Sequence, residues 1–178
     1  MTDDLKLPAM RSLGSLADLR PVIVIDSREQ TPLVFTRLES VRGSLTSGDY
    51  SFVGGEEHFA VERKSIPDIV ACCCSGERER FERELHRLRG FQFARLLIVG
   101  RREDVEAGAY RSQASPKAVL HSLSAFEARY NVPVAWAATP SAAAEMVESW
   151  TYWFAREIVE AANDLLRDHR ALERRASA

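Results

Sequence analysis

The chain has 178 residues, an apolar fraction of 46% and a formal net charge of −2. This length favours one domain, and this composition supports a packed core. No apolar run approaches the roughly 20 residues that a membrane span requires, and the N-terminus lacks the apolar stretch of a secretory signal. We therefore expect a cytoplasmic protein with no membrane partner, associated with the nucleoid if the source is a prokaryote.

The first predicted element is a buried strand. Residues 1–19 mix leucines with charged residues, a proline and a glycine, and predict a partly ordered tail. Residues 21–26 then form a continuous apolar run that ends on Asp26. Such a run is typical of a strand buried on both faces, with its carboxyl end at a functional edge.

A β-hairpin is predicted next. Residues 41–53 and 58–64 are rich in β-forming residues and flank the pair Gly54 and Gly55. Two such segments around a double glycine favour two antiparallel strands joined by a tight turn.

Helices and strands alternate through the rest of the chain. Serine–proline and threonine–proline pairs mark helix starts, since proline fits the first helical turn. The predicted elements are a helix from Ser65, a helix over 77–89, a buried strand over 94–99, a helix from Ser115, an edge strand over 132–137 and a long helix from Thr139, whose polar end over 167–178 is expected to fray.

This order of elements predicts an α/β fold, with a mixed central β-sheet flanked by helices. We expect an N-terminal tail at 1–19, one domain at 20–160, and a C-terminal helix end and tail at 161–178. The three cysteines are adjacent, at 72–74. Adjacent cysteines make poor disulfides and do not have zinc-site spacing, so they are expected to be packing residues in a reducing compartment.

Charged residues gather where the predicted hairpin ends. Because side chains alternate along a strand, Glu62 and Lys64 point to one face and Arg63 to the other. Asp49 lies on the partner strand and can face Glu62 if the register allows it. Asp26 can complete the group from the end of the first strand.

Two carboxylates and a lysine in this order suit metal-dependent phosphodiester hydrolysis. Mg²⁺ is usually held by one or two carboxylates, with water and substrate phosphate completing its shell. A bound metal eases the deprotonation of water and polarises the phosphoryl oxygen. We therefore predict Asp49 and Glu62 as ligands and Asp26 as a further ligand or base. Lys64 would stabilise the developing negative charge.

Arginine far outnumbers lysine and is concentrated in residues 77–89. Because guanidinium groups suit bidentate contact with phosphate, Arg28, Arg80 and Arg83 are candidates for DNA contacts. A general compositional bias towards arginine, with mutual Arg–Glu pairing along the helix, explains the same pattern equally well.

Three motifs in order resemble the nuclease domain of the XPF family of structure-specific endonucleases. They are IDSRE at 25–29, GDY at 48–50 and VERKSIPD at 61–68. The resemblance extends over about residues 20–160. It implies a restriction-endonuclease-like fold, dependence on Mg²⁺ or Mn²⁺, and branched, flapped or junction DNA as substrate in repair or recombination. By position it places in the site Asp26, Glu29, Asp49, Glu62, Arg63, Lys64 and Asp68.

The resemblance also bears on partners. Members of that family usually carry a tandem helix-hairpin-helix DNA-binding module after the nuclease domain, and this sequence of 178 residues has no room for one. We therefore expect a stand-alone form that cuts alone or borrows DNA affinity from a partner protein. Their nuclease domains pair through helices near this end, which favours a homodimer. Trp150, Trp153 and Phe154 on the last helix belong either to that seam or to the core.

Simpler interpretations remain for several residues. Asp68 is equally explained as a first-turn helix acid, and Arg63 as a structural partner of Glu29 or Asp68. Two alternative functions also remain open. One is a non-catalytic DNA-binding scaffold with the same fold. The other is a generic α/β binding module in which Arg28 and Arg63 neutralise the carboxylates.

Overall fold

The computed structural model describes residues 20–176, so the tail expected at 1–19 lies outside the described residues. Strands and helices alternate in the order that the sequence predicts, with two additions, β2 and α3. The elements are β1 (Ile23–Asp26), β2 (Ser40–Gly43), β3 (Tyr50–Phe52), β4 (Phe59–Ser65), α1 (Ile66–Cys72), α2 (Ser75–Leu88), β5 (Phe93–Val99), α3 (Arg102–Glu106), α4 (Pro116–Tyr130), β6 (Val134–Ala137) and α5 (Pro140–Ala176).

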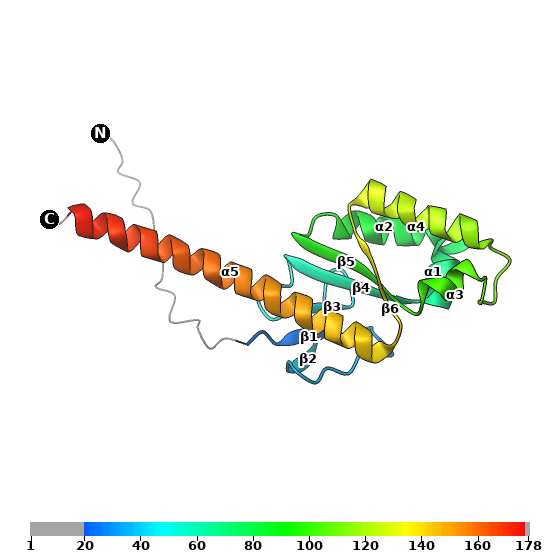
Figure 1. Cartoon of the computed structure of the whole chain (residues 1–178), viewed down its shortest axis with the longest axis horizontal. Coiled ribbons are helices and arrows are strands. Elements are labelled where there is room, and N and C mark those ends of the chain that lie inside the picture. The colour runs from blue at the N-terminus through cyan, green and yellow to red at the C-terminus, as the bar shows by residue number, and fades with distance from the viewer. Residues whose placement is uncertain (1–19, 177–178) are drawn as a thin grey trace.

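The strands form one mixed sheet in the order β2-β1-β3-β4-β5-β6. The β1–β3 and β3–β4 pairs are antiparallel, and the other pairs are parallel. Helices α1, α2 and α4 pack on one face, and α5 crosses the other (Figure 1). This arrangement confirms the predicted mixed sheet flanked by helices.

Strand β4 shows how alternation builds both cores. Phe59 and Val61 pack in the cluster under α5, whereas Ala60 packs in the cluster under α1, α2 and α4. Glu62 and Lys64 continue the Ala60 side of the strand, because side chains two apart share a face. The charged end of β4 therefore points towards the helices α1 and α2.

The end of β4 is fixed by the start of α1. Ser65 caps the helix, and its side chain accepts a hydrogen bond from the backbone of Asp68. Asp68 in turn accepts a hydrogen bond from the backbone of Ser65, which completes a capping box. This pair is the reason that the strand turns into a helix directly after Lys64.

Strand β2 departs from the expectation that residues 41–53 form one arm of the hairpin. Residues 40–43 instead pair in parallel with β1, and only 50–52 form the hairpin strand. The backbone N–H of Leu45, in the loop between them, donates to the carboxylate of Asp26 at 2.8 Å. This hydrogen bond to a side chain takes the place of a backbone hydrogen bond between strands, so the chain can leave the sheet here.

Helix α5 extends through residues 167–176, over most of the stretch where a polar, fraying end was predicted. This stretch contains no glycine or proline, and ion pairs support it, such as Arg167 with Asp164 at 2.8 Å. Its first half packs on the sheet, and its second half projects beyond the body of the molecule (Figure 1). No described helix is both long and apolar enough to span a membrane.

The aromatic residues of α5 divide between core and surface. Trp150 packs against Phe93 with ring centroids 5.9 Å apart, and Phe154 packs against Phe59 at 5.5 Å. These two residues therefore belong to the core, while Trp153 stays 53% exposed.

Candidate active site

The strand register sets three carboxylates at the same level of the sheet. Tyr50 on β3 pairs with Val61 on β4 and, on its other side, with β1. One step further, the backbone of Asp49 donates to the carbonyl of Val61 at 2.8 Å and accepts from the N–H of Asp26 at 2.9 Å. Because directly opposed residues share a face, Asp26, Asp49 and Glu62 all lie on the side covered by α1 and α2.

Asp49 is held by the neighbouring strand. Its Oδ2 accepts a 2.7 Å hydrogen bond from the backbone N–H of Arg63. Burial raises the pKa of Asp49 to about 6, although this hydrogen bond opposes the shift. No hydrogen bond from the described residues reaches its Oδ1, so that oxygen is available to a ligand.

Glu62 and Lys64 form an ion pair on the same face of β4. Glu62 is only 2% exposed, and the Nζ of Lys64 bonds to its Oε1. Burial and the charge of Asp49 raise the pKa of Glu62 to about 8. Burial alone would lower the pKa of Lys64, but the carboxylates of Glu62 and Glu84 outweigh it and the pKa is raised.

The contact with Glu84 was not predicted. Its Oε2 lies 3.7 Å from the Nζ of Lys64, which also sits over the ring of Phe81 at 5.5 Å from its centroid. The signal in the sequence was that Glu84 stands three residues after Phe81 and directly before Leu85, both on the apolar stripe of α2. An acid at the margin of such a stripe faces inwards, in this case onto the catalytic lysine candidate.

Both carboxylate oxygens of Asp26 already accept hydrogen bonds from the protein, which is not expected of a metal ligand. Arg28 donates to both of its oxygens, at 2.7 and 3.1 Å, and the backbone of Leu45 donates to Oδ2 as well. These bonds, led by that from the Arg28 side chain, lower the pKa of Asp26 to about 2. The role of Asp26 as ligand or base therefore stays a prediction that requires Arg28 to release it.

Glu29 and Arg63 form a second ion pair. Arg63 donates to Oε1 at 2.9 Å and to Oε2 at 3.1 Å, and Thr31 donates to the same carboxylate. Burial would raise the pKa of Glu29, but these contacts outweigh it and the pKa is lowered. Arg63 thus pairs with Glu29 as the simpler interpretation expects, and Asp68 caps α1; the catalytic roles that the resemblance gives these residues stay predictions.

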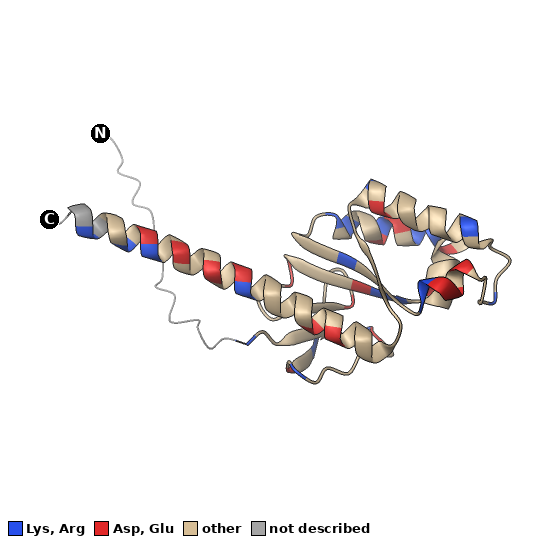
Figure 2. Ribbon diagram, in the orientation of Figure 1, with Lys and Arg blue, Asp and Glu red and all other residues tan. Residues whose placement is uncertain are grey.

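An open hollow of about 620 Å³ lies beside these residues, but Asp26, Glu62 and Glu84 do not line it. Asp49, Lys64 and the exposed guanidinium of Arg28 line it, as do Arg80 and the buried Cys72. Figure 2 shows charged residues together along β4 next to this hollow. Arg83 is exposed but does not line the hollow, so only two of the three arginines predicted to contact DNA are brought to the site.

The donor set fits a hard divalent cation bound by few protein ligands. Asp49 and Glu62 each keep one carboxylate oxygen that no other described residue engages. Within residues 20–176, no three histidine, cysteine, aspartate or glutamate side chains are grouped to hold a metal. Two carboxylates completed by water and phosphate are typical of Mg²⁺ sites, so these residues match that cation.

The comparison with protein families is decisive for identity. The model of the ERCC4 domain matches residues 25–149, a range that includes every predicted catalytic residue. The chain belongs to the ERCC4 domain family. No curated protein is similar enough in sequence to match it.

Solved structures that resemble this ERCC4 domain include two of XPF. XPF from Aeropyrum pernix has a TM-score of 0.60 and 19% identity, over 74% of this chain and 60% of that chain. XPF from Aeropyrum pernix in complex with DNA has a TM-score of 0.60 and 18% identity, over 78% of this chain and 66% of that one. This chain thus spans 60–66% of their length. The similarity confirms the predicted restriction-endonuclease-like fold.

Proposed function

We propose that this ERCC4 domain is a divalent-metal-dependent DNA endonuclease that hydrolyses phosphodiester bonds in branched, flapped or junction DNA. One observation carries the proposal. Asp49 and the buried Glu62 stand opposite each other on adjacent strands, Lys64 pairs with Glu62, and both Asp49 and Lys64 line a hollow that arginines also line. Lys64 pairs with Glu62 but leaves the nearby buried Asp49 without a cation of its own, and a bound divalent ion would supply one.

Each side chain has a task in this proposal. Asp49 and Glu62 would hold Mg²⁺ or Mn²⁺, which supplies Lewis acidity to the phosphate and eases deprotonation of the attacking water. The ammonium group of Lys64, kept charged by its carboxylate neighbours, stabilises negative charge on the phosphate. The hydrogen bond from the backbone N–H of Arg63 orients the carboxylate of Asp49 before substrate binds.

Two observations support DNA as the substrate: exposed arginines at the hollow and the DNA bound in a similar solved structure. The side chains of Arg28 and Arg80 are 70% and 76% exposed, and both line the hollow. Each guanidinium has donors left for phosphate oxygens after its ion pair is made. The similar XPF structure contains DNA. We further propose a cytoplasmic, homodimeric enzyme that obtains DNA affinity from its own arginines or from a DNA-binding partner protein.

The test is a cleavage panel with a matched lysine control. Labelled flap, fork, three-way junction and plain duplex DNA are incubated with Mg²⁺, Mn²⁺ or EDTA. The wild type and Lys117→Ala, which changes an exposed lysine on α4, are expected to cut the branched substrates, and Lys64→Ala is not. Binding without cutting would favour the non-catalytic scaffold, and neither binding nor cutting would favour the generic binding module.

A further inference from the structure

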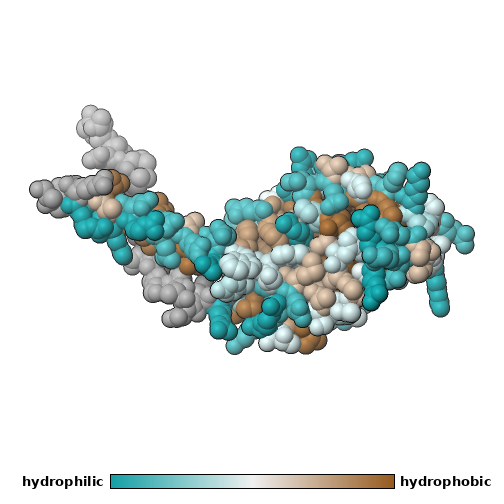
Figure 3. Space-filling view, in the orientation of Figure 1, coloured by the Kyte–Doolittle hydropathy of each residue, from teal (hydrophilic) through white to brown (hydrophobic). Residues whose placement is uncertain are grey.

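A buried carboxylate on α5 lies outside the candidate active site and has no task in the proposed reaction. Glu148 is only 2% exposed, and it belongs to the half of α5 that packs on the sheet. Figure 3 shows that half within the continuous surface of the body, whereas the second half projects from it. A buried charge is costly unless hydrogen bonds compensate for its lost hydration, so the partners of Glu148 matter.

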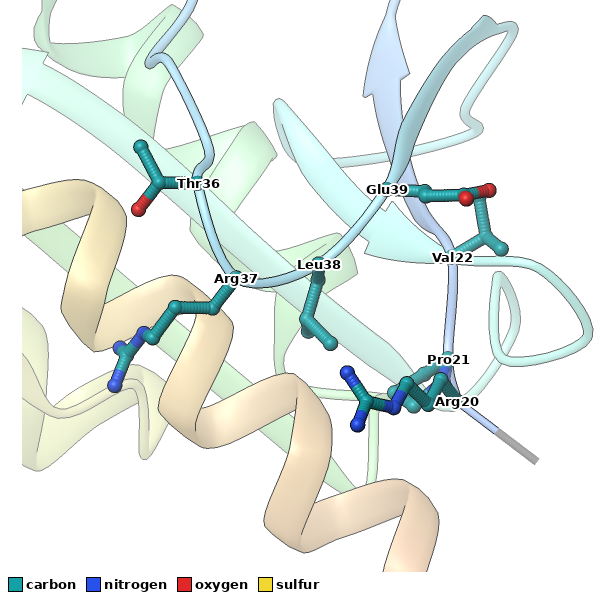
Figure 4. A pocket seen from close by; sticks show the side chains of 7 residues that line it. All are labelled: Arg20, Pro21, Val22, Thr36, Arg37, Leu38 and Glu39. Carbon is teal, nitrogen blue, oxygen red and sulfur yellow. The ribbon is translucent and has the colours of Figure 1, made fainter. Parts of the chain in front are cut away.

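The partner of Glu148 is the loop over residues 27–39, which joins β1 to β2. Its Oε1 accepts hydrogen bonds from the backbone N–H groups of Thr36, Arg37 and Leu38, at 2.9, 2.6 and 3.1 Å. Its Oε2 accepts from the Nε of Arg37 at 2.9 Å, and Figure 4 shows this side chain extending towards α5. Three successive N–H groups around one oxygen form a nest for an anion. Here the anion is a side chain more than a hundred residues away along the chain.

Glu148 stays ionised in this nest. Burial would raise the pKa of Glu148, but the hydrogen bonds that it accepts, led by that from the Arg37 side chain, outweigh burial and the pKa is lowered. The guanidinium of Arg37 also donates to the backbone carbonyl of Glu145 at 2.8 Å. Because hydrogen bonds to an ionised group are stronger than neutral ones, this contact ties the loop firmly to α5.

The first part of the same loop forms one wall of the hollow. Arg28, Glu29, Gln30 and Thr31 all line it. The side chain of Arg28 is a candidate for DNA contact, and Gln30 beside it is exposed. The shape that the hollow presents to a substrate therefore depends on how the loop is held.

Two further contacts hold the earlier part of the loop. At its start, Glu29 pairs with Arg63. In its middle, the backbone N–H of Leu33 donates to the hydroxyl oxygen of Tyr50 at 3.0 Å, and Phe35 packs edge-on against the same ring. Phe35 directly precedes the segment that binds Glu148. The middle contact thus depends on the contact with α5, and residues 30–32 lie between the middle and the start.

We propose that Glu148 is a positioning residue for the candidate active site. By binding residues 36–38 to α5, it keeps Leu33 and Phe35 on Tyr50 and so fixes the wall over residues 28–31. Tyr50 directly follows Asp49, so the same contact supports the strand beside a predicted metal ligand. The kinetic consequence of this inference rests on the proposed nuclease function, whereas its structural consequence does not.

The simpler alternative is that Glu148 only stabilises the fold. Its removal would then lower the melting temperature but leave the wall in place in every folded molecule. The two cases differ in the local opening of the loop and in the kinetic constant that changes.

The first measurement is hydrogen exchange of individual amides by NMR, on full-length chains at a temperature at which each is folded. Glu148→Ala is expected to speed exchange at least about tenfold at residues 36–38. A similar gain is expected at Leu33, which donates to Tyr50, and at Thr31, which donates to Glu29. Glu157→Ala, which removes an exposed acid from the same helix, is the matched control and should change none of these rates.

The second measurement is steady-state cleavage of branched DNA. Glu148→Ala should raise KM about three- to tenfold and leave kcat within about twofold, because the wall contacts substrate while the predicted metal ligands stay on their strands. Glu148→Gln keeps an oxygen for the backbone N–H groups and should restore most of the loss. A residue that only stabilises the fold would leave KM unchanged.

Arg37→Ala repeats both measurements if Glu148→Ala does not fold. It removes the side-chain bonds of Arg37 to α5 but leaves the three backbone bonds to Glu148, so the same changes are expected at about two- to threefold. Arg37 does not line the hollow, so its removal takes away no direct contact there.

Three results overturn the proposal. They are faster exchange at residues 36–38 with unchanged exchange at Thr31 and Leu33, an unchanged KM in active Glu148→Ala, and equal changes in Glu157→Ala. A wild type that cuts no DNA would contradict the nuclease proposal alone, because the exchange rates still decide whether Glu148 fixes the wall.

Discussion

The backbone N–H of Arg63 donates a 2.7 Å hydrogen bond to the Oδ2 of Asp49, while the side chain of Arg63 forms an ion pair with Glu29 on the opposite face of the sheet. One residue thereby fixes a catalytic candidate with its main chain and a structural pair with its side chain. The bond uses one oxygen of Asp49 and leaves the other to a ligand.

Replacing Asp49 separates orientation from charge. Asp49→Asn keeps an acceptor for Arg63 but removes the charge, whereas Asp49→Ala removes both. We expect both variants to lose at least about tenfold in Mn²⁺ affinity by calorimetry. Only Asp49→Ala should lose stability, by about 1–3 kcal/mol, because it leaves a buried N–H unpaired. Equal metal affinity in Asp49→Ala and wild type would remove Asp49 from the ligand set.

Metal binding should depend on pH through Asp49. Its pKa is raised to about 6, so the carboxyl is protonated below that pH and must lose a proton to bind a cation. Glu62, with its pKa raised to about 8, must lose a proton as well, so Mn²⁺ affinity is expected to fall as pH drops below 8 and to fall more steeply below pH 6, where Asp49 is also protonated. Titrations at pH 5, 6, 7 and 8 measure this, and no added steepness below pH 6 in wild type relative to Asp49→Asn would contradict the assignment.

Glu84 is expected to tune Lys64. It shares the ammonium group with Glu62 and helps to raise the pKa of both neighbours. Glu84→Gln should lower kcat about three- to tenfold with little change in KM. The pH–rate profile should move to lower pH, because Glu62 then ionises more easily.

The matched control for Glu84→Gln is Glu79→Gln, on the exposed side of the same helix. If both variants show the same kcat and the same pH–rate profile as wild type, Glu84 has no part in positioning the lysine. Glu84→Asp should restore part of the activity if the carboxylate itself matters.

The Asp26–Arg28 pair should stabilise the fold in a pH-dependent way. The pKa of Asp26 is lowered from 3.8 to about 2, so its contribution is full above about pH 4 and is lost as pH falls towards 2. Asp26→Asn is expected to cost about 2 kcal/mol at pH 7 by urea unfolding. That cost should shrink between pH 4 and pH 2, whereas exposed Glu57→Gln should cost little at any pH. A constant cost would show that Asp26 acts by packing rather than by charge.

Arg80 and Arg83 provide a matched test of the DNA surface. Both are exposed on α2, but only Arg80 lines the hollow. Arg80→Ala is expected to weaken binding of branched DNA and to reduce the salt slope by about one unit. Arg83→Ala should change both less. Equal effects would mean that DNA lies along the helix rather than across the hollow.

Local signals in the sequence were sufficient for most elements. Ser65 with Pro67, and Ser115 with Pro116, marked the starts of α1 and α4 as the structure has them. Period-two alternation set Glu62 and Lys64 on one face of β4. These features depend on neighbours within a few residues, and so they could be predicted without knowledge of the fold.

Longer-range features could not be predicted. β2 is a four-residue strand with three exposed residues and no buried apolar face, and its pairing with β1 is decided by the tertiary fold. Predicting that Arg28 and Leu45 would occupy the carboxylate of Asp26 required knowledge of the path of the 44–49 loop. The approach of Glu84 to Lys64 required the packing of α2 on the sheet. Whether Asp49 would stand opposite Glu62 depended on the length of the turn between their strands, which the sequence does not determine.

The pairing of Tyr50 with Val61 has an evolutionary consequence. A strand that slips by one residue turns every side chain to the opposite face. Such a slip in β4 would drive Glu62 into the aromatic interior beneath α5 and turn Val61 to the charged face beneath α1 and α2. Insertions inside this hairpin would thus destroy folding and chemistry together, so we expect length variation among descendants to collect outside it.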